Sequence, residues 1–305
     1  MLALSIVAGL MLLGMAFGVF EYDGLLDDLL SEGTSSDDED DAVVIDGTSG
    51  SDLLQTTDDD EEIDAGGGPD TVEAEGGDDV ILAGGGNDDI SGGTGNDTLV
   101  GEEGNDTLFG NQGLDAIFGG AGSDNIDGGS GDDTVLGQSG DDSILGRAGG
   151  DFLNGGTGED TIKGGAGDDL LVGYEDSLFD SSFEDSDIYD PDVLLGGAGT
   201  DAIIAGSGDT IDGGDGIDYL TLGSWIDPSN PVQIEEFEAS EDIIAVIVPD
   251  DYAGAAVITV DHYSGVTHSG TILLDGVRLA EVDGGGTLGS LSAAAITVIY
   301  QDNFA

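Results

Sequence analysis

The sequence predicts an all-β fold, a right-handed parallel β-solenoid built from nine-residue rows. Residues 47–172 divide into fourteen consecutive rows without an insertion. The sixth position is acidic and the eighth is aliphatic in every row, as in Gly92 to Val100. The fourth position is glycine in every row except one, where it is Asp59. A fixed short period is typical of a solenoid, because one row cannot bury a core until its neighbours stack on it.

Each row divides into a turn and a strand. Glycine at positions one, two and four permits a tight turn, and positions seven to nine form a three-residue strand whose eighth side chain points inward. Two rows then make one coil, and turns on the same side of the solenoid come from alternate rows. We therefore expect Asp79 to stack over Asp97, and Asp124 over Asp142.

The charge of the chain needs a counterion. The chain has 305 residues and a formal net charge of −64, with only three basic residues. Such a balance excludes nucleic-acid binding, which depends on Lys and Arg, and it opposes compaction. Yet 38% of the residues are hydrophobic, more than expected of a disordered polyanion. The two facts agree if multivalent cations belong to the folded state. Cysteine is absent, which excludes disulfides and thiolate sites.

The repeat resumes after one interruption. Residues 174–191 form an acidic insert with four aromatic residues, which we expect to be a surface loop. Three more rows follow to Thr221, and the one from Ala205 to Asp212 is a residue short. The array should therefore hold about eighteen rows in nine coils, with a length of about 43 Å at about 4.8 Å per stacked strand.

Two segments precede the array. Residues 1–20 are almost wholly apolar, and they could be a membrane anchor, a cleaved export signal or a buried helix. Residues 21–41 form an acidic linker, which begins with a stripe of Leu25, Leu26, Leu29 and Leu30 that is consistent with a short amphipathic helical turn. The solenoid region spans residues 42–221.

Residues 222–305 differ in composition and predict a small C-terminal β domain. Apolar runs with alternation replace the glycine-rich turns. Asp275-Gly276 between residues 271–274 and 277–282 predicts a β-hairpin, and residues 293–300 predict a last strand. Such a domain could cap the open end of the solenoid.

The repeated turns offer the ligands that Ca²⁺ prefers, which are carboxylates combined with backbone carbonyls. The chemistry of the turn therefore predicts calcium sites between stacked rows, whereas Mg²⁺ demands stricter octahedral geometry. The candidate carboxylates are Asp52, Asp70, Asp79, Asp88, Asp97, Asp106, Asp115, Asp124, Asp133, Asp142, Asp151, Asp160, Asp169, Asp192, Asp201, Asp209 and Asp218. The candidate carbonyls are those of turn residues such as Gly84, Gly86, Gly93, Gly95, Gly120, Gly122, Gly129, Gly131, Gly156, Gly158, Gly165 and Gly167.

These rows resemble the calcium-binding nonapeptide repeats of RTX (repeats-in-toxin) proteins, over residues 47–221. The resemblance implies a parallel β-roll with Ca²⁺ between successive turns, position-six aspartates as ligands, and type I secretion with folding outside the cell. The tail at residues 293–305 is compatible with a C-terminal secretion signal, whereas the apolar N-terminus departs from the family pattern. The row at residues 56–64 also departs, because it has no glycine.

The sequence shows no catalytic motif. There is no H-E-x-x-H, no G-x-S-x-G and no phosphate loop, and His262, His268 and Trp225 are better explained as surface or packing residues. We therefore expect a non-enzymatic, extracellular protein, which residues 1–20 could hold to a membrane. The alternatives are an adhesion module whose C-terminal domain contacts a cell-surface or matrix ligand, and a toxin or hydrolase fragment.

Overall fold

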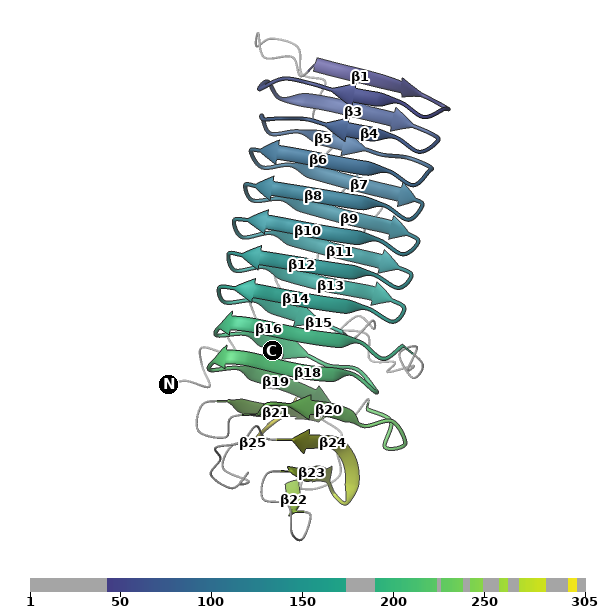
Figure 1. The fold of residues 1–305 in the computed structure, drawn as a ribbon. Coiled ribbons are helices and arrows are strands. Elements are labelled where there is room, and N and C mark those ends of the chain that lie inside the picture. Colours follow the sequence, from purple (N-terminus) through teal and green to yellow (C-terminus); the bar gives the residue numbers. More distant parts are fainter. Residues whose placement is uncertain are drawn as a thin grey trace.

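The structure is a computed structural model that describes residues 43–173, 190–223, 226–237, 242–248, 258–262, 269–283 and 296–300. In these residues the chain winds into a parallel β-solenoid of about nine turns, whose strands form two long sheets (Figure 1). The fold class is therefore confirmed at the level of an all-β parallel solenoid. The expectations for residues 1–41, for residues 174–189 of the insert, for Trp225 and His268, and for residues 293–295 and 301–305 of the tail lie outside the described residues.

Alternate rows contribute to the two sheets. The first, which we call the β1 sheet, runs in the order β1 (Val43–Thr48), β3 (Glu61–Gly66), β5 (Val80–Leu82), β7 (Thr98–Glu103), β9 (Ala116–Ala121), β11 (Thr134–Ser139), β13 (Phe152–Thr157), β15 (Leu170–Val172), β17 (Ala202–Ile204), β19 (Tyr219–Gly223), β21 (Ile243–Val248) and β25 (Ile296–Tyr300). The second, the β2 sheet, runs in the order β2 (Leu53–Gln55), β4 (Thr71–Glu73), β6 (Asp89–Thr94), β8 (Thr107–Gln112), β10 (Asn125–Ser130), β12 (Ser143–Ala148), β14 (Thr161–Ala166), β16 (Val193–Gly199), β18 (Thr210–Gly216), β20 (Val232–Glu235), β24 (Val277–Asp283), β23 (Ser269–Leu274) and β22 (Ile258–His262).

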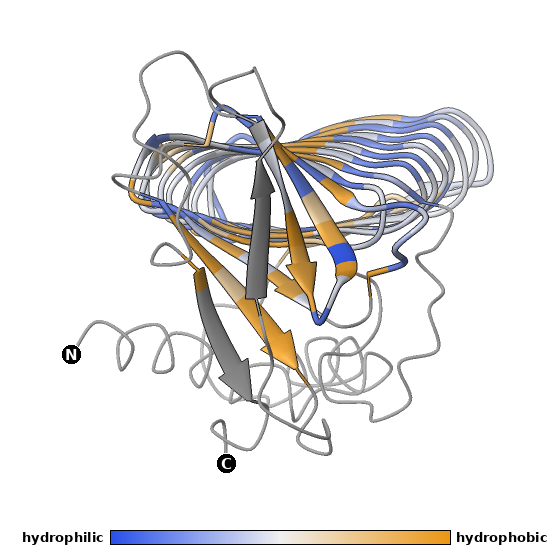
Figure 2. Cartoon of the chain, turned by 90° about the horizontal axis from the view of Figure 1, so that it is seen from below, coloured by the Kyte–Doolittle hydropathy of each residue, from blue (hydrophilic) through white to orange (hydrophobic). Residues whose placement is uncertain are grey.

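The register follows the repeat. Thr98 pairs with Ala116 and Asn125 with Ser143, eighteen residues or two rows apart. Thr161 pairs with Val193 across the insert, so the insert leaves the alignment of the coils intact. Seen from the end in Figure 2, the coils superpose, and residues of like hydropathy lie over one another.

Most strands of the array are longer than the three residues predicted, which is a correction, whereas β4, β5 and β15 have the predicted three. Strands such as β8 and β10 have six residues, which occupy positions seven to nine and then one to three of the next row. The Cα pairing skips position one, as between Val100–Phe118 and Glu102–Gly120. Position two has a positive φ, 116° at Gly93 and 69° at Glu102, so the chain bends there and still pairs with the next coil. Only positions four to six form the turn.

The core consists of the position-eight side chains, as predicted. Leu99, Leu108 and Ile117 are fully buried, and the same cluster continues through Leu220. Adjacent rows place these side chains alternately on the two sheets, so the aliphatic ladders pack face to face between them.

The strands after residue 222 continue the two sheets. β20 pairs in parallel with β18, and β21 pairs in parallel with β19. The predicted hairpin is confirmed, since β23 and β24 pair antiparallel around Asp275 and Gly276, whose φ angles are 52° and 85°. The described strands of this region therefore extend the two sheets, in parallel as far as β24 and β25 and antiparallel from β24 through β23 to β22. Among the residues that the structure describes, no helix is long and apolar enough to cross a membrane.

Candidate metal centre

The position-six aspartates form a hydrogen-bonded ladder along each edge of the solenoid. The backbone N–H of Asp79 donates to Oδ1 of Asp97 at 3.0 Å, and that of Asp124 donates to Oδ1 of Asp142 at 2.8 Å. The ladder crosses the insert, where the N–H of Asp160 donates to Oδ1 of Asp192 at 2.8 Å. The predicted stacking of alternate rows is therefore confirmed, with one carboxylate oxygen of each residue used by the backbone of the coil before it.

The second oxygen of these carboxylates is buried and has no hydrogen-bond partner. Their side chains are at most 3% exposed. Burying an ionised oxygen without a partner is costly, so an atom of this kind indicates a missing ligand. This holds for Oδ2 of Asp70, Asp79, Asp88, Asp97, Asp106, Asp115, Asp124, Asp133, Asp142, Asp151, Asp169, Asp201 and Asp218.

These oxygens converge on the glycines at position one. A Cβ atom built on Gly137 would lie 2.3 Å from Oδ2 of Asp142 and 2.4 Å from the carbonyl oxygen of Gly155. A Cβ on Gly119 would lie 2.5 Å from Oδ2 of Asp124 and 2.6 Å from the Gly137 carbonyl. In these rows two oxygens from adjacent coils thus border one small space that glycine leaves open, whereas Ala65, Ala74 and Ala83 stand at position one of three earlier rows. The donor set and the space fit a cation that prefers oxygen ligands.

The position-one carbonyls are a part of the site that sequence reasoning missed, since the predicted carbonyls belong to positions two and four. At position two, Gly84 O accepts the N–H of Glu103 at 3.0 Å, so one of its lone pairs serves the sheet. At position four, Gly95 O points along the solenoid axis, so close to Gly113 that a Cβ there would clash. Glycine at position one in most rows was the available signal for the carbonyl that faces the carboxylate.

Three acidic residues at irregular rows have internal partners for the second oxygen. Oδ2 of Asp52 accepts the N–H of Thr48 at 2.7 Å, and Oδ2 of Asp209 accepts the N–H of Gly206 at 2.7 Å. Glu61, in the row without glycine, accepts hydrogen bonds from the hydroxyls of Thr56 and Thr57. The structure therefore does not leave these three carboxylates in need of a cation.

Burial raises the pKa of several of the ladder aspartates. The pKa of Asp142 is raised to about 8, first by burial and then by Asp160 and Asp124, although the N–H of Asp124 lowers it. The pKa of Asp133 is raised to about 7 and that of Asp97 to about 6 for the same reasons. The ionised ladder is thus unfavourable in the fold unless positive charge compensates it.

Position five carries a second ladder that sequence reasoning missed. Oδ1 of Asn96 accepts the N–H of Leu114 at 2.9 Å, and Oδ1 of Asp132 accepts the N–H of Gly150 at 2.8 Å. These side chains are exposed, so the bonds order the turn from the outside. The recurrent Asn and Asp at position five were the signal for this ladder.

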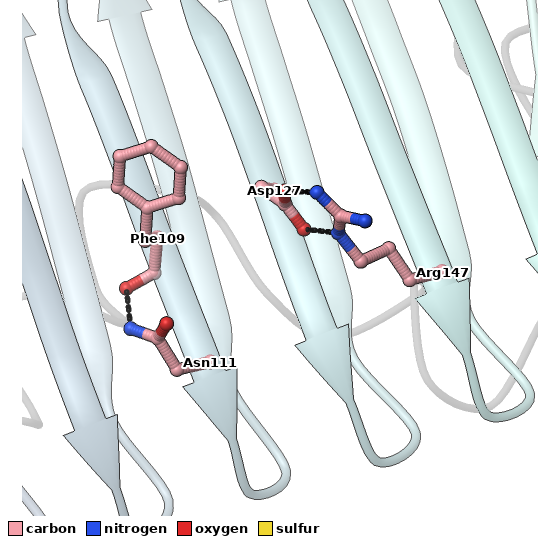
Figure 3. Close-up of polar contacts among 4 residues, drawn as sticks. All are labelled: Phe109, Asn111, Asp127 and Arg147. Atoms are coloured by element: carbon pink, nitrogen blue, oxygen red, sulfur yellow. Dashed lines mark hydrogen bonds and ion pairs between the residues drawn. The ribbon is translucent and has the colours of Figure 1, made fainter.

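The outer face of the β2 sheet holds a pair of opposite charges. Arg147 lies beside Asp127 and donates to both of its carboxylate oxygens, while the amide of Asn111 donates to the backbone carbonyl of Phe109 (Figure 3). Arg147 is one of only three basic residues in the chain, and its guanidinium is occupied outside the turns. It therefore does not neutralise the aspartate ladders.

The comparison with known families agrees with this geometry. The family model of the RTX calcium-binding nonapeptide repeat (four copies) matches residues 44–72, 55–90, 82–117, 91–126, 110–144, 118–153, 145–177 and 190–209. The chain belongs to this family. The matches cover half of the chain, and they coincide with the ladders described above. No curated protein matches the chain.

The RTX repeats do not gather carboxylates into a cluster. Within the described ranges, no group of three or more His, Cys, Asp or Glu side chains lies close enough to hold a metal ion. This agrees with a site in which each row contributes one buried carboxylate and backbone carbonyls supply the remaining oxygens, as Ca²⁺ coordination allows. The RTX solenoid is a structural calcium-binding fold.

Proposed function

We propose that this RTX protein binds Ca²⁺ ions between successive turns on both edges of the solenoid, and that calcium binding drives its folding. The partnerless Oδ2 atoms carry the proposal, because they are buried and several of them, such as those of Asp106, Asp124 and Asp142, lie beside a carbonyl oxygen of the next coil. Bound Ca²⁺ would supply positive charge between stacked carboxylates, with the position-six aspartates and the position-one carbonyls as ligands. The carbonyls of positions two and four complete the proposed ligand set.

The roles of the protein groups follow from the ladders. Oδ1 of each aspartate accepts a hydrogen bond from the backbone N–H of the preceding coil. This hydrogen bond orients Oδ2 toward position one of the aspartate's own row. In the rows that have glycine at position one, the missing Cβ keeps the space open. If about 14 sites each took one divalent ion, about 28 negative charges would be compensated.

Calcium binding of this kind couples to folding. The ligands of one site come from two coils, so the site does not exist in the unfolded chain, and the binding free energy becomes folding free energy. A charge of −64 keeps the calcium-free chain expanded. We infer that the chain is exported through a type I secretion apparatus in this state and folds at extracellular calcium concentrations. Residues 1–20 could hold it to a membrane, and residues 222–305 would form the end unit that it presents.

The role that we propose is non-catalytic. The test uses the full chain and follows circular dichroism while calcium is removed with a chelator and then restored. A β-sheet spectrum should disappear and return, and equilibrium dialysis should count several ions per chain. Magnesium at the same concentration should restore less of the signal, because it requires octahedral geometry and retains its water. A β-sheet spectrum that chelator leaves unchanged would refute the proposal.

A further inference from the structure

The outer face of the β1 sheet carries apolar side chains that the core does not use. Val100, Phe118 and Leu136 stand at position nine of their rows, next to the inward position eight, so they point away from the core. They form a hydrophobic cluster separate from the main core, against which Leu82 and Ala116 pack. We call these five residues the outer cluster.

The outer cluster is more buried than a sheet surface accounts for. Val100, Phe118 and Leu136 are only 8%, 6% and 8% exposed. Phe109 and Leu145, at the same position on the β2 sheet, are half-buried. Phe118 has the larger neighbours, Val100 and Leu136, whereas Phe109 lies between Ser91 and Asp127. Neighbours within one sheet cover the sides of an outward side chain but not its outer end, so they do not account for an exposure of 6% at Phe118. The outer cluster therefore has the environment of a covered surface.

The charge pattern also sets this face apart. From Val80 to Val172, none of the outward residues at positions seven and nine of the β1 sheet is charged. The β2 sheet carries Glu73, Asp89 and Asp127 at the equivalent positions. An uncharged apolar strip is unusual on a chain with 67 acidic residues, and strips of this kind mark contact surfaces.

We propose that the segment Leu25–Leu30 of the same chain docks on the outer cluster. The segment lies outside the described residues, and no role is assigned to it by the calcium sites. As a helical turn, its four leucines share one face and extend about 7.5 Å. The cluster from Val100 to Leu136 spans two strand spacings, which is about 10 Å. The apolar lengths therefore match.

The length of the connecting chain fits this docking. Residues 31–42 separate the leucines from β1, and these twelve residues can span at most about 40 Å. The outer cluster begins two strand spacings from β1, at Leu82 of β5, and ends after five, about 10 to 24 Å away. A tethered segment has a high effective concentration, whereas a second copy would bring another −64 charges to the surface.

The absence of cysteine permits a direct test by thiol labelling in saturating calcium. Ala116→Cys places a thiol in the outer cluster, and Ser143→Cys places one at the equivalent position on the β2 sheet as the matched control. Each is made in the full chain and again with Leu25, Leu26, Leu29 and Leu30 replaced by serine. The rate of reaction with a water-soluble maleimide is measured, and circular dichroism checks that all four proteins fold.

The serine replacements should speed labelling of Ala116→Cys by about tenfold, the change that about 1.4 kcal/mol of docking free energy produces, and should leave Ser143→Cys unchanged. Equal rates for Ala116→Cys in both backgrounds would overturn the proposal. Protection that is lost on dilution would also overturn it, because a second copy would then be the cover. If the serine variant does not fold, a double variant tests the docking instead. Leu26→Cys/Ala116→Cys should form an intramolecular disulfide, and the control Leu26→Cys/Ser143→Cys should not. Failure of the first double variant to form this disulfide would refute the docking.

Discussion

Replacing Asp142 with asparagine should stabilise the solenoid without calcium and reduce the stabilisation that calcium adds. Oδ1 of Asp142 accepts the N–H of Asp124 at 2.8 Å, and the asparagine carbonyl preserves this bond. The second oxygen becomes an NH₂ group beside the carbonyl of Gly155, to which it can donate. The buried charge and the partnerless acceptor are then both removed.

The two effects have different sizes. Relieving one buried unsatisfied group should raise the free energy of unfolding in chelator by about 1–3 kcal/mol. A site that binds only the folded state contributes about 2.7 kcal/mol at 100 times its Kd and about 4.1 kcal/mol at 1,000 times. Loss of the Asp142 site should lower the calcium increment by these amounts. At high calcium the loss exceeds the gain, so the order of stability of the two proteins should reverse.

Urea unfolding followed by circular dichroism measures both effects, with a constant concentration of a stabilising osmolyte so that the calcium-free fold is populated. Asp141→Asn is the control, because it removes the same charge one residue away, from an exposed side chain whose Oδ1 accepts the N–H of Glu159. The control should change both values little. A variant at Asp142 that is destabilised equally with and without calcium would show that the carboxylate is only a structural acceptor, and the reasoning would fail.

Three further outcomes are expected. Gly137→Ala should raise the calcium concentration at the folding midpoint and lower the free energy of unfolding by about 1–3 kcal/mol, since its Cβ would fill the space between Oδ2 of Asp142 and the carbonyl oxygen of Gly155. Gly85→Ala is the control, because a Cβ there meets nothing within 4 Å, and its calcium titration should match that of the parent. In chelator, acidification should increase the β-sheet signal, because burial raises the pKa of Asp142 from 3.8 to about 8. The stability that protonation of Asp142 contributes is complete below pH 3.8 and is lost as the pH rises through 8. A β-sheet signal that falls between pH 8 and pH 5 would contradict this. Arg147→Ala should lower the free energy of unfolding by no more than about 1 kcal/mol, because its ion pair with Asp127 is exposed. The calcium concentration at the folding midpoint should not change. A shifted midpoint would show that this ion pair contributes to calcium binding.

The ladder of aspartates could be predicted from sequence because the period alone determines it. Once two rows make a coil, Asp79 must lie beside Asp97, whatever the details of the turn. The aliphatic core at position eight follows in the same way from the alternation of a strand. The hairpin at Asp275-Gly276 was predictable because a type I′ turn requires the residues that tolerate positive φ.

The local geometry of the turn could not be predicted in the same way. Glycine at position two suggested a turn, but Glu102, Asn111 and Arg147 adopt the same positive φ there. The conformation is therefore imposed by stacking on the adjacent coils rather than by residue type. Because of it the strands extend through position three, and the position-one carbonyl turns toward the carboxylate. These features depend on contacts between coils, which a single row does not contain.

Each aspartate ladder also has a direction. Every rung runs from the N–H of one coil to the carboxylate of the next coil along the chain, as from Asp106 to Asp124 and from Asp124 to Asp142. A partly wound solenoid therefore has two chemically different fronts. Its N-terminal front exposes carboxylates that still lack their N–H donors, and its C-terminal front exposes amides that still lack their acceptors. Winding toward the N-terminus thus brings a new N–H to a waiting carboxylate, whereas winding toward the C-terminus brings a new carboxylate to a waiting N–H, although each added coil carries its own aspartates in either direction.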